Sequence, residues 1–510
     1  MMKLFQFFSL TILTQGVLLL NQIVLLPIQI RIWGHASTAY WYATLAVATV
    51  TSVADFGLRT AGHAELIRYA HNPAAQQVKN EFRHLWAWIR ILISVGTIAL
   101  IAVDLFYHCL CAKTCYPLWR AALTIGIALE TLLCIRVTYL DSLELYREAE
   151  ASYLLLAASR LCLAIGALIL FHSPPDTLGW TWFFTGVFAL AHQSRLCRRL
   201  GLLRLFESMP AGLSFKTLAI ARHTMADPCS SWMRNNVPVL ILSAIAQPLA
   251  ITTYVALRAV FGAARQLIMQ FSRYASVRYV SLRQSHKTSV AEVQITLCVL
   301  FAAFFASVLN CIVIADNFRL ASLWLVKSDA NLYRAIAIIF GVATPFYAYQ
   351  IVQALMLRFG KVNQIARRQY LYIICLVIFS AVALLTKSLL LWLVLILVAD
   401  IMISFSFMLQ PSGMSILAQK SAGVRGFLAA LTSGLLGAGL WLVLRFESFD
   451  FLQRSTAQAV TYTLAFLSLW ILVIAAVYLY IAHDLIPNAR TLAAFAFGTL
   501  LRICSGGTDK

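Results

Sequence analysis

Long apolar stretches recur along nearly the whole chain and are separated by short polar segments. Each is about 20 residues long, the length that a helix needs to cross roughly 30 Å of hydrocarbon. The pattern predicts an all-α polytopic membrane protein with about 14 spans. We place the spans at 5–30, 38–58, 85–107, 117–139, 151–171, 178–194, 229–247, 249–272, 291–315, 331–357, 369–386, 388–410, 426–445 and 459–482.

Composition and charge support this class. Of 510 residues, 61% are hydrophobic and 12% are charged, and the formal net charge is +20. Nucleic-acid binding is not needed to explain the charge, because most of the 40 Lys and Arg residues fall in connections on one side of the predicted membrane. Attraction to anionic lipid headgroups accounts for the basicity. The asymmetry predicts that both termini are cytoplasmic and that the first apolar run is an uncleaved helix.

The first two spans are unusually polar for helices that face lipid. The first carries Asn21, Gln22 and Pro27, and the second closes with Asp55 and Arg59. Polar and ionisable groups at membrane depth normally face the protein interior or a water-filled path. We therefore expect this pair of helices to line such a path.

A weak internal repeat predicts two related six-helix bundles. Asn21 and Gln22 precede Pro27 in the first span as Asn235 and Asn236 precede Pro238 in the seventh. The second and eighth spans also begin with similar short segments, at 42–47 and 254–260. A long basic connection at 195–227 separates the halves. We predict an N-terminal bundle over 1–212, a C-terminal bundle over 213–425, and two extra spans with an interfacial tail over 426–510.

Arginines outnumber acids within the predicted spans. Arg160 and Arg258 lie deep, and Arg234 lies beside Asn235 in a polar half-span. A buried arginine implies a partner or a ligand, because burying the charge is costly. An excess of cations suits an anionic substrate, and the planar guanidinium suits a diphosphate in particular.

The main acids in the predicted spans are Asp55, Asp104, Glu130 and Asp400. Asp55, Glu130 and Asp400 are candidates for ion or proton coupling. For Glu130 and Asp400, pairing with arginines on neighbouring helices is the favoured alternative.

No enzymatic constellation, phosphate-binding loop or strong metal pattern is present in the sequence, so we expect a transporter without a cofactor or metal. Cys109, Cys111 and Cys115 lie in a predicted outward loop, where a disulfide could persist. The sequence leaves open whether they form one.

The first hairpin resembles a known family. Leu26-Pro27-Ile28, Arg31, Gly34, Tyr42 and Ala54-Asp55-Phe56-Gly57-Leu58-Arg59, with the segment 254–258, are similar to the polysaccharide transporter, or Wzx-type flippase, branch of the multidrug/oligosaccharidyl-lipid/polysaccharide (MOP) exporter superfamily. The resemblance implies two six-helix bundles around a cationic central cavity. It also implies a flippase that moves undecaprenyl-diphosphate-linked oligosaccharide from the cytoplasmic to the periplasmic leaflet of the bacterial inner membrane, with a glycan polymerase as a possible partner.

Carried over to this chain, the resemblance makes Arg31, Arg59 and Arg258 the leading headgroup ligands, although Arg59 could equally be a cytoplasmic anchor. The other substrate-binding candidates are Arg234, Arg160, Asn21, Gln22 and Asn235. The alternatives are a multidrug antiporter of the same superfamily, a lipid II flippase, and a membrane glycan polymerase or ligase. Glycan identity, repeat-unit size, coupling ion and oligomeric state are not determined by the sequence.

Overall fold

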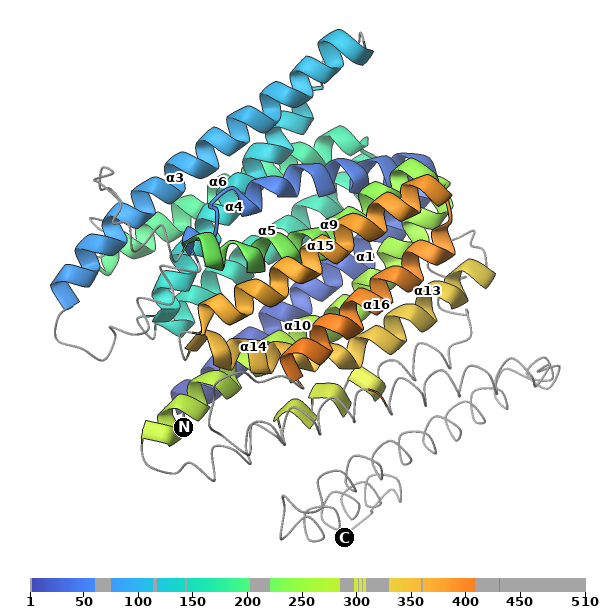
Figure 1. Cartoon of the computed structure of the whole chain (residues 1–510). Coiled ribbons are helices and arrows are strands. Elements are labelled where there is room, and N and C mark those ends of the chain that lie inside the picture. Colours follow the sequence, from blue (N-terminus) through green and yellow to red (C-terminus); the bar gives the residue numbers. More distant parts are fainter. Residues whose placement is uncertain are drawn as a thin grey trace, which may run out of the picture. The chain divides into compact units, whose positions relative to one another are not determined.

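The computed structural model describes residues 2–59, 75–112, 117–142, 145–201, 221–284, 298–300, 302–304, 306–308, 330–358, 361–408 and 431. Regular structure in these ranges is helical throughout (Figure 1), which confirms the predicted all-α class. The α-helices are α1 (Met2–Ala48), α3 (Ala75–Phe106), α4 (Leu118–Ser142), α5 (Tyr146–Phe171), α6 (Pro175–Arg199), α9 (Ala226–Ile245), α10 (Pro248–Gln284), α13 (Ala330–Ala343), α14 (Tyr349–Arg358), α15 (Val362–Thr386) and α16 (Leu389–Met408). Three short helical segments are η1 (Thr49–Val53), η2 (Tyr107–Ala112) and η3 (Thr344–Ala348).

Seven helices within the described ranges are long and apolar enough to cross a membrane. They are Gly16–Val53, His84–Cys109, Leu118–Val137, Arg147–Phe171, Asn331–Met356, Val362–Thr386 and Leu389–Phe407. Helices α6 (25 residues) and α9 (20 residues) also have the length of a span. The predicted span 459–482, the tail, most of 291–315 and all but one residue of 426–445 lie outside the described residues, so the count of 14 stays a prediction.

Helix α1 is interrupted at Gly34, between the first two predicted spans. Gly34 has φ 75° and ψ 174°, a conformation that favours glycine. Leu25 and Ala48 belong to one core cluster. In a straight helix they would lie about 35 Å apart. The chain therefore folds back on itself at Gly34, and we call residues 35–48 the second arm of α1.

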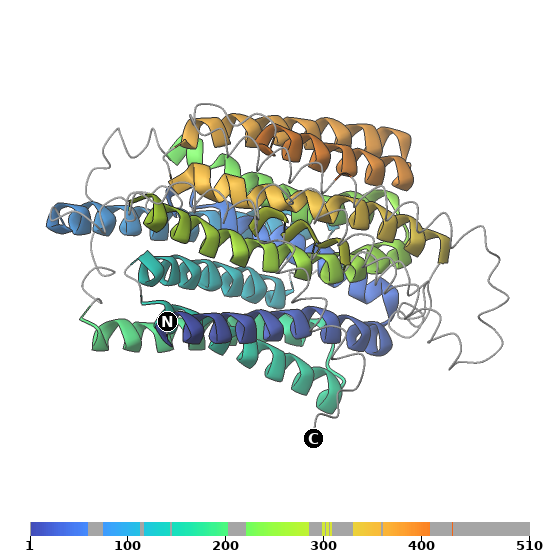
Figure 2. The ribbon, with the colours of Figure 1, turned by 90° about the horizontal axis from the view of Figure 1, so that it is seen from below.

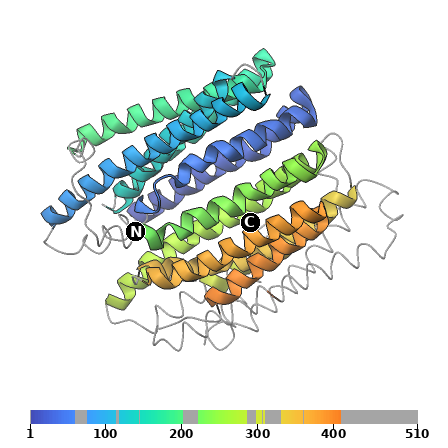
Figure 3. The ribbon, with the colours of Figure 1, turned by 45° about the horizontal axis from the view of Figure 1, so that its top comes forward.

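Tryptophans form the centre of the core that α1 shares with α4, α5 and α6. The ring centroid of Trp41 lies 5.8 Å from that of Trp119 and 5.6 Å from that of Trp182. Helices α4, α5 and α6 pack against one another, as Figures 2 and 3 show. Buried aromatic rings supply most of the contact area at such a centre, which fixes the second arm of α1 against this bundle.

Small residues allow α4 and α6 to approach closely. A Cβ atom added to Gly126 would lie 2.6 Å from the Trp182 backbone, and one added to Gly179 would lie 2.5 Å from the Trp119 carbonyl oxygen. Transmembrane helices commonly pack through such residues, because their association depends on van der Waals contact rather than on burial from water. The two glycines thus determine the spacing of this helix pair.

We expect Gly126→Ala to lower the stability of the protein by about 1 to 3 kcal/mol, because the added methyl group meets backbone atoms that cannot turn away. Thermal unfolding of the detergent-solubilised protein measures this effect. Gly166→Ala, on α5, is the matched control, since no atom lies within 4 Å of its added Cβ. Equal melting temperatures for the two variants would contradict the close approach.

Contacts divide the chain into two units. The first comprises Met1–Ala263, Arg319–Tyr333 and Met356–Ala399, and the second Ala264–Phe318, Arg334–Leu355 and Asp400–Lys510. Within the second unit, the rings of Tyr349 and Phe407 stack 5.2 Å apart. The predicted boundaries at 212/213 and 425/426 follow the sequence repeat and stay a prediction.

Candidate functional site

The second arm of α1 and the segment that follows it contact the two helices of the predicted second half within the first unit. Helix α1 and η1 both contact α9, and hydrogen bonds join residues 35, 49 and 57 to residues 252, 232 and 224. The hydrogen bonds are His35 Nδ1 with Thr252 Oγ1 at 2.9 Å, Trp232 Nε1 to Thr49 Oγ1 at 3.2 Å, and Thr224 Oγ1 to the Gly57 carbonyl oxygen at 2.7 Å. This junction holds three of the predicted site residues.

Arg234, Asn235 and Arg258, which we call the α9 arginine group, lie at this junction. The Arg258 guanidinium donates a hydrogen bond to the backbone carbonyl of Asn235 and interacts electrostatically with Tyr42 on the second arm of α1. Pro238, one turn further along α9, lacks the N–H that would bond the carbonyl of Arg234. The polar half-span thus interrupts the regular helical bonding of α9 next to Arg258.

Arg234 is buried between α9 and α15. Its Nε donates a hydrogen bond of 2.8 Å to the hydroxyl of Tyr372, and its guanidinium lies 4.5 Å from the centre of the same ring. Stacking on an aromatic face is a favourable position for an arginine in an apolar environment. Asn235 therefore links the two arginines, because Arg234 precedes it in α9 and Arg258 of α10 bonds its carbonyl oxygen.

Glu130 and Arg160 form an ion pair between α4 and α5. Arg160 Nη2 lies 3.0 Å from Glu130 Oε2, and the guanidinium lies 4.5 Å from the centre of the Trp182 ring. Arg160 is buried, whereas Glu130 keeps 32% of its side-chain surface exposed. This geometry matches the favoured alternative for Glu130, an arginine partner on a neighbouring helix.

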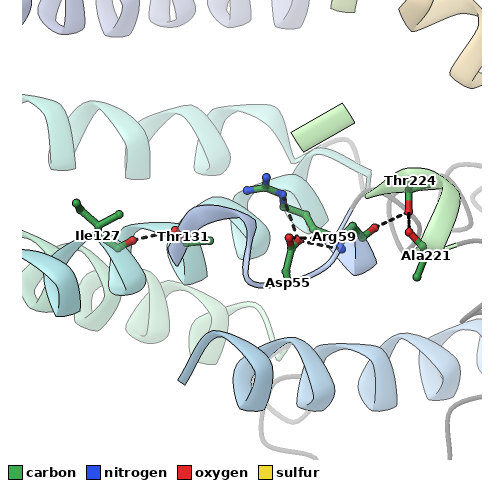
Figure 4. A network of polar contacts seen from close by, with 7 residues as sticks. Asp55, Arg59, Ile127, Thr131, Ala221 and Thr224 are labelled. Atoms are coloured by element: carbon green, nitrogen blue, oxygen red, sulfur yellow. Dashed lines mark hydrogen bonds and ion pairs between the residues drawn. The ribbon is translucent and has the colours of Figure 1, made fainter. Parts of the chain in front are cut away.

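Asp55 and Arg59 form a second ionic contact at the end of the η1 segment (Figure 4). Asp55 is fully buried and accepts hydrogen bonds from the backbone N–H groups of Gly57 at 3.4 Å and Arg59 at 3.2 Å, as the capping residue of a helix does. The Arg59 Nε lies 3.8 Å from the Asp55 carboxylate. Asp55 thus orders the turn as well as balancing the arginine.

Two residues that the sequence reasoning did not single out connect these ion pairs. Cys134 lies one turn after Glu130, and its thiol shares a hydrogen bond with the hydroxyl of Tyr153. Both groups lie within electrostatic range of Arg59. A polar track therefore crosses the N-terminal bundle from Arg160 to Asp55. Neither an isolated Cys nor a Tyr inside an apolar span carries a signal that could have revealed it.

The remaining candidates are Arg31, Asn21, Gln22 and Asp400. Arg31 is exposed, and Asn21 is half-buried, with a buried Oδ1 that has no hydrogen-bond partner among the described residues. The side chain of Gln22 lies outside the described residues. Asp400 is buried in the second unit and accepts a 3.1 Å hydrogen bond from the Tyr347 hydroxyl.

The other residues singled out in the sequence lie near the ends of α3 and α4. Arg120 contacts Asp104 at 2.8 Å and also hydrogen-bonds His108. Cys109 carries a free, exposed thiol. The side chain of Cys111 and the whole of Cys115 lie outside the described residues, so a disulfide between these two is not tested.

No family model matches the chain, and no curated protein matches it. Solved structures do. The lipid II flippase MurJ in an inward closed conformation is 11% identical with a TM-score of 0.58, and the alignment covers 94% of this chain and 99% of that one.

Two multidrug transporter structures are also similar. A MATE transporter in complex with Br-NRF is 12% identical with a TM-score of 0.53, and the alignment covers 84% of this chain and 96% of that one. The eukaryotic MATE transporter AtDTX14 is 12% identical with a TM-score of 0.55, with coverages of 84% and 100%. The chain therefore has the fold shared by MATE transporters and MurJ, as the first hairpin had indicated.

Proposed function

We propose that the protein is a flippase that moves undecaprenyl-diphosphate-linked oligosaccharide from the cytoplasmic to the periplasmic leaflet of a bacterial inner membrane. The main support for this proposal is the α9 arginine group at the junction of α1, α9 and α10. Two arginines, one preceding Asn235 in α9 and one bonded to its carbonyl oxygen, suit the paired oxygens of a diphosphate.

The structural comparison supports a lipid-linked substrate more than a drug. The alignment with MurJ spans 94% of this chain, and those with the two MATE structures span 84%. A flippase has to pass a charged headgroup while the lipid tail stays in the bilayer. In this proposal the sugar and diphosphate move along the arginine-bearing junction, and the first and second halves of the fold open alternately to the two sides.

The second candidate is a multidrug antiporter of the same fold. The buried carboxylates Asp55 and Asp400 favour it, because acids at membrane depth can bind cations or protons. An antiporter would show drug-dependent uptake of protons or Na⁺ in proteoliposomes. A flippase would show no drug dependence and would instead move a polyprenyl diphosphate.

The first experiment measures lipid-linked oligosaccharide in a strain that lacks the protein, with complementation by wild type and by variants. We expect completed units to accumulate on the cytoplasmic side and Arg258→Ala to restore export at least about tenfold less well than wild type. Arg258→Lys keeps the charge but loses the planar fork, so it should restore export partly. Arg199→Ala, at an exposed position at the end of α6, is the control.

Two results would contradict the proposal. Normal arrival of the units in the periplasm, where they remain unpolymerised or unattached, would favour a polymerase or ligase. Full complementation by Arg258→Ala, with expression and melting temperature equal to wild type, would remove the α9 arginine group from the mechanism. Measuring both properties for each variant separates a binding defect from a folding defect.

A further inference from the structure

We propose that Arg222, His223 and Arg367 form a surface site for the diphosphate headgroup of a membrane lipid, with the lipid tail lying along α15. The inference rests on the proposed function, because the site would receive the lipid-linked substrate before it enters the protein. Arg222 and His223 belong to the short segment before α9, and Arg367 belongs to the first turns of α15. This site is distinct from the α9 arginine group.

The segment before α9 and the first turn of α9 are hydrogen-bonded to α15, and these bonds do not use the side chains of Arg222 and His223. The Tyr370 hydroxyl donates a 2.6 Å hydrogen bond to the Arg222 carbonyl, and Gln369 Nε2 donates one of 3.3 Å to Asp227. The side chains of Arg222 and Arg367 remain exposed. The fold therefore holds the segment that carries Arg222 against the helix that carries Arg367, and both guanidinium groups stay accessible to a ligand.

His223 indicates the sign of the local potential. Arg222 Nε donates a 3.2 Å hydrogen bond to His223 Nε2. Desolvation, together with the positive charges of Arg222 and Arg367, lowers the pKa of His223 below its usual value. Because Nε2 accepts the hydrogen bond from Arg222, the ring carries its proton on Nδ1. Two cations and one neutral donor then suit a multiply charged anion, which would also offset the repulsion between the arginines.

The face of α15 that continues from Arg367 toward the C-terminal end of the helix favours a lipid over a soluble anion as the ligand. Arg367, Leu371, Ile374 and Ile378 follow the spacing of one helical face. The three apolar residues are 53% to 62% exposed, and they belong to the span Val362–Thr386. Arg367 thus lies at the headgroup end of a stripe that faces acyl chains, with Tyr370 beside it at the level where tyrosines are enriched. A headgroup and a tail would bind to continuous surfaces.

The test uses the full-length protein in nanodiscs of phosphatidylcholine, with geranylgeranyl diphosphate as the probe. We expect the double variant Arg222→Gln/Arg367→Gln to bind the probe at least about tenfold more weakly than wild type. The control variant Arg195→Gln/Arg199→Gln removes the same charge from exposed positions on α6 and should bind as wild type does. Melting temperatures show whether each variant is folded.

Three outcomes would overturn the inference: unchanged affinity in the Arg222→Gln/Arg367→Gln variant, an equal loss in the control variant, or inorganic pyrophosphate binding as tightly as the lipid probe. The last would identify a site for a soluble anion. The assay measures binding and requires no transport. A wild type that binds the probe through these arginines but fails to move it would overturn the flippase proposal and leave this site in place.

Discussion

Replacing Gly57 with alanine should strongly destabilise the protein and abolish transport. Gly57 has φ 76°, which an alanine adopts only with strain. An added Cβ would also lie 2.3 Å from the backbone nitrogen of Met225. Strain and collision together should cost about 2 to 6 kcal/mol. The thermal melting temperature of the purified protein and the export assay measure the two effects.

Gly201 provides a control that separates strain from collision. It has φ 69°, close to that of Gly57, yet no atom lies within 4 Å of its added Cβ. Gly201→Ala should therefore show only the cost of the backbone conformation, about 1 to 2 kcal/mol. If Gly57→Ala had the same melting temperature as Gly201→Ala and exported normally, the close contact between residue 57 and the segment before α9 would not be required for stability or transport.

The helical architecture could be predicted from the sequence because membrane spans depend on a local property. In lipid each apolar run of about 20 residues has to satisfy its own backbone hydrogen bonds, and a helix does so without distant partners. The predicted span 117–139 accordingly matches α4 to within one residue at its start, and 369–386 lies within α15. The turn between the first two spans could also be expected, because polar and small residues interrupt the apolar pattern at Gly34.

The composition of the site was harder to predict. Arg234, Asn235 and Arg258 were visible because charged and amide groups are rare in apolar spans. Their partner Tyr372 was not, since a tyrosine in an apolar span has the same pattern as a lipid-facing aromatic residue, and the same holds for Trp182, which contacts Arg160. Pairing across helices depends on how the helices rotate and pack, and a single sequence contains no information on either.

The Glu130–Arg160 pair should behave as a structural unit rather than as two separate functional groups. Glu130→Leu leaves the Arg160 charge in a site where 8% of its side-chain surface is exposed, so it should cost about 3 to 5 kcal/mol. Arg160→Met should cost less, because Glu130 is 32% exposed and water can reach its carboxylate. Thermal unfolding of the single variants and of the double variant measures the coupling between them.

The double variant Glu130→Leu/Arg160→Met should recover much of the lost stability, because it leaves no unbalanced charge in the bundle. If the pair only holds α4 against α5, this variant also exports normally. The corresponding double variant of Asp104 and Arg120, an ion pair of 2.8 Å whose side chains are 17% and 14% exposed, is the reference for loss of a structural pair. A Glu130→Leu/Arg160→Met protein that is as stable as the reference but inactive would contradict the structural assignment. It would instead place the carboxylate or the guanidinium in coupling or substrate binding, in line with the polar track that leads from this pair to Arg59 and Asp55.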